Sequence, residues 1–206
     1  MDLELKDKVV VITGGSKGIG LGIARAFAGE GASVVLAART KSEVERAAAN
    51  IKDEYGVKAT AVPSDVATVD GCNAIIAAAE GAGGADIFVS NAGTGTDETV
   101  ANAPDEKWQY FWNLHAMAAG RISRALALQM EKKGGGAMIN IASICAVQPS
   151  ASEPIYNTTK AALMMLSKCL SNELISKNIR VNTVNPGLIQ KPDWESRAQR
   201  EHKGAD

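Results

Sequence analysis

The strongest structural signal in this chain is the stretch Val9-Val-Val-Ile-Thr13-Gly14-Gly15-Ser16-Lys17-Gly18-Ile19-Gly20. Its β-branched start predicts a strand that is buried on both faces of a parallel sheet. Apolar residues then recur at helical spacing from Ile19 to Phe27, which predicts a helix directly after the glycine-rich turn. Backbone N–H groups and the positive end of the helix dipole meet at such a turn, and glycine lets a ligand approach the backbone closely. The stretch therefore predicts a phosphate site.

The glycine spacing narrows the kind of phosphate site. A nucleoside triphosphatase loop needs Lys and then Ser or Thr after its last glycine, but Leu21 follows Gly20. The common dinucleotide spacing Gly-x-Gly-x-x-Gly does not fit either. A glycine-rich connection without a ligand stays open as the alternative for this stretch alone.

Size and composition favour one folded domain. The chain has 206 residues, of which 46% are hydrophobic, and this argues against disorder. A net charge of −1 gives no reason to expect nucleic acid or an anionic membrane as partner. No uncharged apolar run approaches the roughly 20 residues that span a bilayer, and no signal peptide is recognisable. Cys72, Cys145 and Cys169 indicate neither a disulfide framework nor a zinc site, so a cytoplasmic location is expected.

Strands and helices alternate along the sequence. Strands are predicted at 9–12, 33–38, 59–62, 86–90, 137–142 and 180–184, and helices from 18, at 41–55, 69–80, 104–132 and 154–176. This order predicts an α/β fold, a doubly wound parallel sheet in which ligands lie at the carboxyl ends of the strands. We expect a nucleotide-binding and catalytic domain over residues 1–190. The charged residues 191–206 are expected to form a tail that begins a substrate flap.

Tyr156 and Lys160 are the first candidates for chemistry. They are four residues apart, so on a helix they share one face. A nearby ammonium lowers the pKa of a tyrosine from its usual value of about 10, as an acid/base catalyst near neutral pH requires. A core tyrosine beside a solvated lysine is the alternative.

Two further polar residues accompany this pair. Ser143 follows a predicted strand and could hydrogen-bond a substrate oxygen, or could be a turn or cap residue. Asn113 lies inside the predicted helix 104–132, where asparagine is unfavourable, so it is either solvated or an internal hydrogen-bond partner.

Taken together, these motifs resemble the one-domain short-chain dehydrogenase/reductase family, including 3-oxoacyl-carrier-protein reductases and related carbonyl reductases. The match runs over about residues 6–189, with the motifs in the family's order, and it implies a Rossmann-type fold. It also implies a catalytic tetrad of Asn113, Ser143, Tyr156 and Lys160. In this tetrad Tyr156 transfers the proton and Ser143 hydrogen-bonds the same oxygen. Lys160 binds the nicotinamide ribose and lowers the tyrosine pKa, while Asn113 holds a water.

The resemblance also implies the residues that bind the cofactor. These are Gly14, Ser16, Lys17, Gly18, Ile19, Gly20, Arg39, Asp65, Val66, Asn91, Ala92, Gly93, Tyr156, Lys160, Pro186, Gly187 and Ile189. Ala38 stands where an acidic residue would accept the ribose 2′-OH of NAD. Lys17 and Arg39 offer two cations to a 2′-phosphate, so NADP(H) is expected, with NADPH preferred over NADH. No metal is expected, since His115 and His202 form no ligand cluster.

The expected function is hydride transfer between NADP(H) and a carbonyl or alcohol substrate, as in a 3-oxoacyl reductase. The loop 144–149 is mostly apolar and weakly favours a moderately apolar carbonyl compound. Two alternatives stay open. One is a non-catalytic NADP(H)-binding or regulatory protein, and the other is a nucleotide-sugar epimerase or dehydratase, because those enzymes share Tyr-x-x-x-Lys.

The sequence departs from the family near its end. Lys191 stands where the family usually has a threonine beside the nicotinamide, and the chain ends at Asp206, earlier than is usual. We expect an exposed sixth strand, a reduced substrate wall and an open flap. The expected assembly is a homodimer through the helices at 104–132 and 154–176, with a tetramer possible in a longer form.

Overall fold

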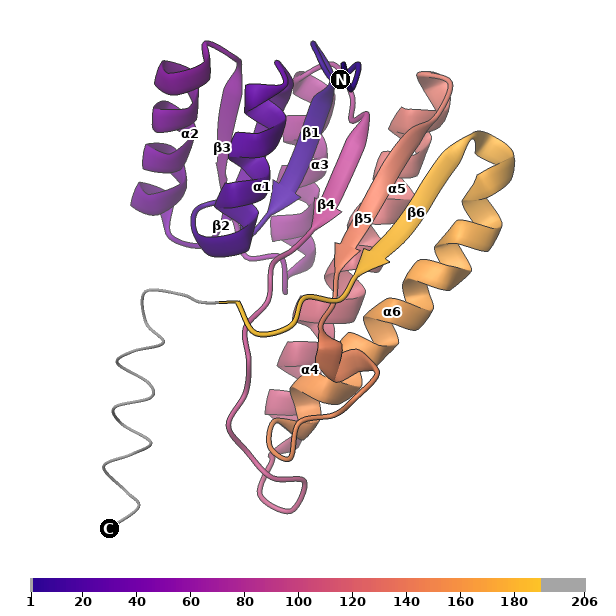
Figure 1. The fold of residues 1–206 in the computed structure, drawn as a ribbon. Helices are drawn as coiled ribbons and strands as arrows, with labels where there is room; N and C mark the ends of the chain where they lie inside the picture. The colour runs from indigo at the N-terminus through magenta and orange to yellow at the C-terminus, as the bar shows by residue number, and fades with distance from the viewer. Residues whose placement is uncertain (1, 190–206) are drawn as a thin grey trace.

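A computed structural model describes residues 2–189 and contains one parallel sheet of six strands in the order β3-β2-β1-β4-β5-β6 (Figure 1). The strands are β1 Val9–Thr13, β2 Ser33–Ala38, β3 Ala59–Pro63, β4 Ile87–Ser90, β5 Gly136–Ile141 and β6 Ile179–Val184. The predicted α/β fold with a doubly wound parallel sheet is confirmed, and each predicted strand is present.

The helices cover both faces of the sheet (Figure 1). They are α1 Gly18–Gly29, α2 Lys41–Tyr55, α3 Val69–Gly81, α4 Asp105–Trp112, α5 Ala118–Lys132 and α6 Pro154–Leu174. Short 3₁₀ turns occupy Ile144–Ala146 and Ile175–Lys177. Residues of α1 and α2 form one core cluster with the sheet, and residues of α3 to α6 form a second cluster on the opposite face.

The central strand β1 shows why the sheet is buried on both sides. Val10 and Ile12 belong to the core beneath α1 and α2, whereas Val9 and Val11 belong to the opposite core. The four side chains are at most 5% exposed, as the unbroken β-branched run predicts. From β1 the chain winds outward through β2 and β3, then crosses to β4, β5 and β6. The strand order therefore reverses between β1 and β4, and a ligand is expected at the carboxyl ends of these two strands.

The predicted single helix 104–132 is wrong in one respect, because a π-helical turn at Asn113–Met117 separates α4 from α5. The N–H of Ala118 bonds the carbonyl of Asn113, five residues earlier. This wider turn takes up an extra residue and directs Leu114, His115 and Ala116 into the protein. It changes the direction of every side chain that follows Asn113.

Several large apolar side chains lie on the outside of the helices after β4. Trp112, Met117, Leu128 and Met165 are 38–64% exposed. Dimerisation through this face stays a prediction. The predicted tail 191–206, including Lys191, lies outside the described residues. Within residues 2–189 no helix is both long and apolar enough to cross a membrane.

Candidate active site

The glycine turn after β1 has the geometry of an anion site. Gly14 and Gly18 adopt left-handed conformations, with φ of +66° and +56°. A side chain at Gly20 would collide with the Gly14 carbonyl and the Asn91 amide, so glycine lets the turn pack against the end of β4. A Cβ at Gly18 would meet nothing within 4 Å, which leaves that side of the turn open. The first turn of α1 contains no acidic residue, and within residues 2–189 no side chain caps it. Its free N–H groups therefore suit the phosphates of a nucleotide.

Asn91 holds this turn in place. Its Nδ2 donates to the carbonyls of Thr13 at 2.9 Å and Gly14 at 3.2 Å. The Thr13 hydroxyl oxygen in turn accepts from the N–H groups of Asn91 at 2.9 Å and Ala92 at 3.0 Å. The end of β4 is thus locked to the end of β1, where the strand order reverses.

The other residues expected to bind the cofactor follow the remaining strands. After β3, the Asp65 carboxylate accepts from the Ala67 N–H at 2.9 Å, and Val66 is buried. After β6, the Pro186 carbonyl accepts from the Ile144 N–H at 3.0 Å. Ser16 and Ile19 are partly buried in the glycine turn and the first turn of α1, whereas Gly187 and Ile189 lie on the exposed segment after β6.

The two expected phosphate-binding cations differ in how they are held. The Lys17 side chain is 79% exposed, and its Nζ lies 3.7 Å from Oε2 of Glu43. Arg39 follows β2 and donates from Nη1 to the hydroxyl of Tyr110 at 3.0 Å. Within residues 2–189, Arg39 but not Lys17 is therefore oriented by a hydrogen bond that it donates to a side chain of another element.

Ser143, Tyr156 and Lys160 lie together at the carboxyl end of β5. Ser143 is 8% exposed, accepts from the Cys145 N–H at 3.1 Å and lies close enough to Tyr156 to lower the pKa of the phenol. Lys160 is 3% exposed, and its Nζ donates to the Ile141 carbonyl at 2.8 Å. The same Nζ lies 5.7 Å from the centre of the Tyr156 ring.

Burial dominates the ionisation of this pair. It raises the pKa of Tyr156 above its usual value, and the hydrogen bond from Ser143 offsets part of the rise. Burial also lowers the pKa of Lys160 to about 8. The pKa of Tyr156 is thus raised mainly by burial, while the Lys160 ammonium donates to the Ile141 carbonyl; its effect on the tyrosine stays a prediction. Lys160 is a group that can release a proton near neutral pH.

The Asn113 side chain hydrogen-bonds a residue outside this cluster. It is partly buried at the start of the π-helical turn, and its Oδ1 accepts from Nη2 of Arg121 at 3.3 Å. The structure thus brings three of the four expected tetrad residues together and places Asn113 against Arg121, one helix segment further on.

His115 is a site residue that sequence reasoning missed. It is 1% exposed, and its Nδ1 lies 2.8 Å from the hydroxyl of Thr159. The Thr159 hydroxyl donates its only hydrogen to the Ile155 carbonyl at 2.7 Å. Toward the histidine it is therefore an acceptor, and the Nδ1–H of His115 is the donor. Nε2 is then a bare acceptor, buried and without a partner within residues 2–189.

His115 lies beside two of the expected catalytic residues, Tyr156 and Lys160. Its ring packs edge-on against Tyr156, with centroids 5.6 Å apart. A Cβ at Gly93 would lie 3.1 Å from Nε2 and 3.3 Å from Nζ of Lys160, so glycine keeps the space between them open. Burial and the charge of Lys160 lower the histidine pKa to about 3, which keeps the ring neutral. Only its position two residues after Asn113 could have drawn attention to it.

Glu153 is the second residue that was missed. It precedes α6 in a left-handed conformation with φ of +66°, which is unusual for a residue with a side chain. A side chain at Gly95 would collide with its Oε1. The carboxylate also contributes to the raised pKa of Tyr156. The negative charge of Glu153 thus acts on the phenol. Within residues 2–189 no group of three or more His, Cys, Asp or Glu suits a metal ion.

Sequence comparisons identify related proteins. A family model described as short chain dehydrogenase matches residues 8–202. The dehydrogenase/reductase SDR family member 4 of Oryctolagus cuniculus is 37% identical over 204 residues, which cover 96% of this chain and 78% of the rabbit protein.

Solved structures agree with this match. The L-sorbose reductase of Gluconobacter frateurii, in complex with NADPH and L-sorbose, superposes with a TM-score of 0.97 at 53% identity, covering 100% of this chain and 78% of that one. An NAD⁺-bound xylitol dehydrogenase superposes with a TM-score of 0.89 at 26% identity, covering 98% and 79% of the two chains.

Proposed function

This chain belongs to the short-chain dehydrogenase family, and from that premise we propose that it is an NADPH-dependent reductase of polyhydroxylated ketones. The observation that carries the proposal is the cluster of Ser143, Tyr156 and Lys160 beside an open phosphate turn. The cluster supplies a proton donor for the oxygen of a carbonyl group. A regulatory nucleotide-binding protein would need the turn but no such donor.

Each residue of the cluster has its own role in proton transfer. The Tyr156 hydroxyl donates its proton to the substrate oxygen, and Ser143 hydrogen-bonds the same oxygen as negative charge develops on it. Lys160 binds the ribose next to the nicotinamide and, with a pKa of about 8, returns a proton to the tyrosine. The buried Nε2 of His115 offers an acceptor to this relay, and Asn113 begins the π-helical turn that carries the histidine. The nicotinamide, when bound, supplies the hydride.

The preference for NADPH rests on the residues after β1 and β2. Ala38 carries no carboxylate that would repel a 2′-phosphate, and Lys17 and Arg39 offer it two cations. The 53% identity to a reductase complexed with NADPH supports this preference. The fold alone does not decide it, because the xylitol dehydrogenase with the same fold is bound to NAD⁺.

Glu153 supports a hydroxylated substrate. A carboxylate near the reacting phenol accepts hydrogen bonds from hydroxyl groups, but would be poorly solvated beside an apolar substrate. The L-sorbose complex of the 53% identical reductase points to the same class. A less hydroxylated ketone is the second candidate, because Ile144 and Val147 at the site are 43% and 58% exposed.

A substrate panel tests the proposal. NADPH oxidation by the purified chain is followed with ketoses, simple alkyl ketones and 3-oxoacyl thioesters at matched concentrations, and NADPH and NADH binding is measured separately. We expect the highest kcat/KM with a ketose and tighter binding of NADPH than of NADH. Glu153→Gln should raise the KM for the ketose and leave that for an alkyl ketone unchanged. Faster turnover of the thioester would contradict the substrate class, and NADPH binding without any turnover would favour the regulatory alternative.

A further inference from the structure

Tyr110 is the hydrogen-bond partner of Arg39, and we propose that it positions this guanidinium for the 2′-phosphate and so helps to set the nucleotide preference. The inference rests on the proposed NADPH preference and adds to it a residue that neither the glycine turn nor the tetrad contains. Tyr110 is a positioning residue, since it acts on the phosphate through Arg39.

The hydrogen bond joins two distant parts of the chain across the nucleotide end of the sheet. Arg39 directly follows β2, and Tyr110 lies 71 positions later in α4, after the crossover to β4. In the sheet, β1 lies between β2 and β4, so the contact spans the point where the strand order reverses. That is the place where a doubly wound sheet binds its nucleotide.

The Tyr110 ring is anchored by packing against the core. Its ring packs edge-on against Phe111, with centroids 5.3 Å apart and an interplanar angle of 87°. Phe111 is 7% exposed and belongs to the core between the sheet and α3 to α6, and the Tyr110 ring packs against the same core. The ring is thus fixed by packing, and its hydroxyl is the part that reaches Arg39.

A fixed hydroxyl restricts an otherwise mobile cation. Arg39 is exposed, and a free arginine side chain loses much rotamer entropy when it binds a ligand. Tyr110 engages Nη1 only, so most of the five N–H donors of the guanidinium remain for a phosphate. The phenol oxygen accepts from Arg39, so the hydroxyl holds the guanidinium in one direction and acts on the phosphate through it.

Lys17 lacks such a support. Its side chain is 79% exposed and lies 3.7 Å from Glu43, a distance at which an exposed pair contributes little. Lys17 therefore adds positive charge without a fixed direction, whereas the Arg39–Tyr110 pair adds donors in a defined geometry. The pair is the better candidate for distinguishing a phosphate from a hydroxyl group.

Dissociation constants of NADPH and NADH test the role of Tyr110. Tyr110→Phe keeps the ring and its packing and removes only the hydroxyl. We expect roughly three- to ten-fold weaker NADPH binding, as typical for lost preorganisation of one side chain, with the NADH constant unchanged within about two-fold. Titration with fluorescence detection needs no substrate. An unchanged ratio of the two constants, an equal loss for both nucleotides, or tighter NADPH binding would overturn the inference.

A second pair of variants separates this inference from the proposed function. In an Arg39→Ala background, Tyr110→Phe should cause no further loss of NADPH affinity, because the residue that it positions is gone. If Arg39→Ala itself leaves the preference for NADPH over NADH unchanged, the proposed role of Arg39 fails. If Arg39→Ala weakens NADPH binding and Tyr110→Phe does not, only the inference about Tyr110 fails.

Discussion

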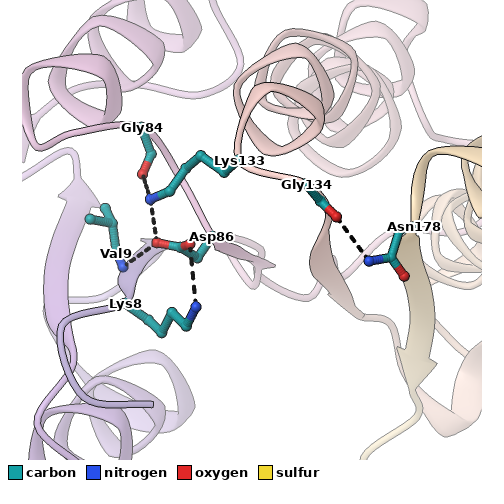
Figure 2. Close-up of polar contacts among 7 residues, drawn as sticks. All are labelled: Lys8, Val9, Gly84, Asp86, Lys133, Gly134 and Asn178. Carbon is teal, nitrogen blue, oxygen red and sulfur yellow. Dashed lines mark hydrogen bonds and ion pairs between the residues drawn. The ribbon is translucent and has the colours of Figure 1, made fainter. Parts of the chain in front are cut away.

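Charged groups at the two ends of the parallel sheet are held in opposite ways. At the amino end, Asp86 accepts from the Val9 N–H at 2.8 Å and from Nζ of Lys133 at 2.6 Å, and lies 4.0 Å from Lys8 (Figure 2). Lys133 also donates to the Gly84 carbonyl at 2.9 Å. These contacts tie β1, β4 and the end of α5 together, and each charge has an opposite charge beside it.

At the carboxyl end, burial instead shifts the pKa of ionisable groups toward their uncharged forms. Lys160 is 3% exposed with a pKa lowered to about 8, and His115 is kept neutral with a bare acceptor nitrogen. Ionisable groups with perturbed pKa values gather where a protein performs chemistry. Substitutions at the carboxyl end should therefore affect turnover first, and substitutions at the amino end should affect stability first.

The largest expected effect is on turnover. Tyr156→Phe removes the transferable proton, so kcat should fall at least roughly 10²-fold, as is typical for the loss of a general acid. The free energy of unfolding should change by less than about 1 kcal/mol, because the ring is kept. Steady-state kinetics and denaturant unfolding measure both quantities. Tyr55→Phe, in α2, is the matched control and should retain full activity, while undiminished activity of Tyr156→Phe would refute the role of Tyr156.

At the amino end, stability should change more than turnover. Asp86→Ala leaves the Val9 N–H and Lys133 without their carboxylate, so the free energy of unfolding should fall by about 2–3 kcal/mol. Lys8→Ala is the control, because its contact is 4.0 Å long and its side chain is 49% exposed, and it should cost less than about 0.5 kcal/mol. The folded Asp86 variant should keep its kcat. A loss of kcat with normal stability would contradict the division between the two ends.

The buried histidine predicts a smaller, pH-dependent effect. In the unfolded chain a histidine titrates near pH 6.5, whereas the pKa of folded His115 is about 3. Below pH 6.5 the unfolded state binds the additional proton, so the stability from this group is complete above pH 6.5 and is lost as the pH falls toward 3. Between pH 7 and pH 5 the loss should be about 1–2 kcal/mol.

His115→Phe provides the reference for this measurement. Unfolding at several pH values should show a smaller loss on acidification for this variant than for the parent. Parallel pH profiles would mean that His115 is not held neutral. His115→Asn, which can still donate to Thr159 but lacks the Nε2 acceptor, should lower kcat if the relay uses that nitrogen.

The smallest expected effect concerns Asn178, a left-handed residue at the amino end. Asn178 has a φ of +58°, and its Nδ2 donates to the Gly134 carbonyl at 2.9 Å (Figure 2). Asn178→Ala loses the bond and strains the backbone, which should cost about 1 kcal/mol, whereas Asn178→Gly should cost less because glycine accepts this conformation. Thermal unfolding measures the difference. A glycine variant that is less stable than the alanine variant would contradict a cost of the left-handed backbone at this position.

Local sequence patterns determined most of the secondary structure. The predicted bounds of β2 and α2 agree with the structure, and those of the other strands agree within one residue. Periodicity and turn residues act between near neighbours, so they are readable without a fold. The family, the phosphate turn and the positions of Ser143, Tyr156 and Lys160 follow from short motifs. Their catalytic and cofactor-binding roles remain predictions.

The tertiary structure decided what depends on contacts between distant elements. The π-helical turn after Asn113 is a change of backbone hydrogen-bond partner that leaves no mark in the apolar pattern. His115 meets Thr159 across 44 positions, and Arg39 meets Tyr110 across 71. The hydrogen bond of Lys160 to a carbonyl of β5 depends on how α6 packs on the sheet. A residue's type and spacing are local properties, but its burial, its pKa and its hydrogen-bond partner depend on which elements the fold brings against it.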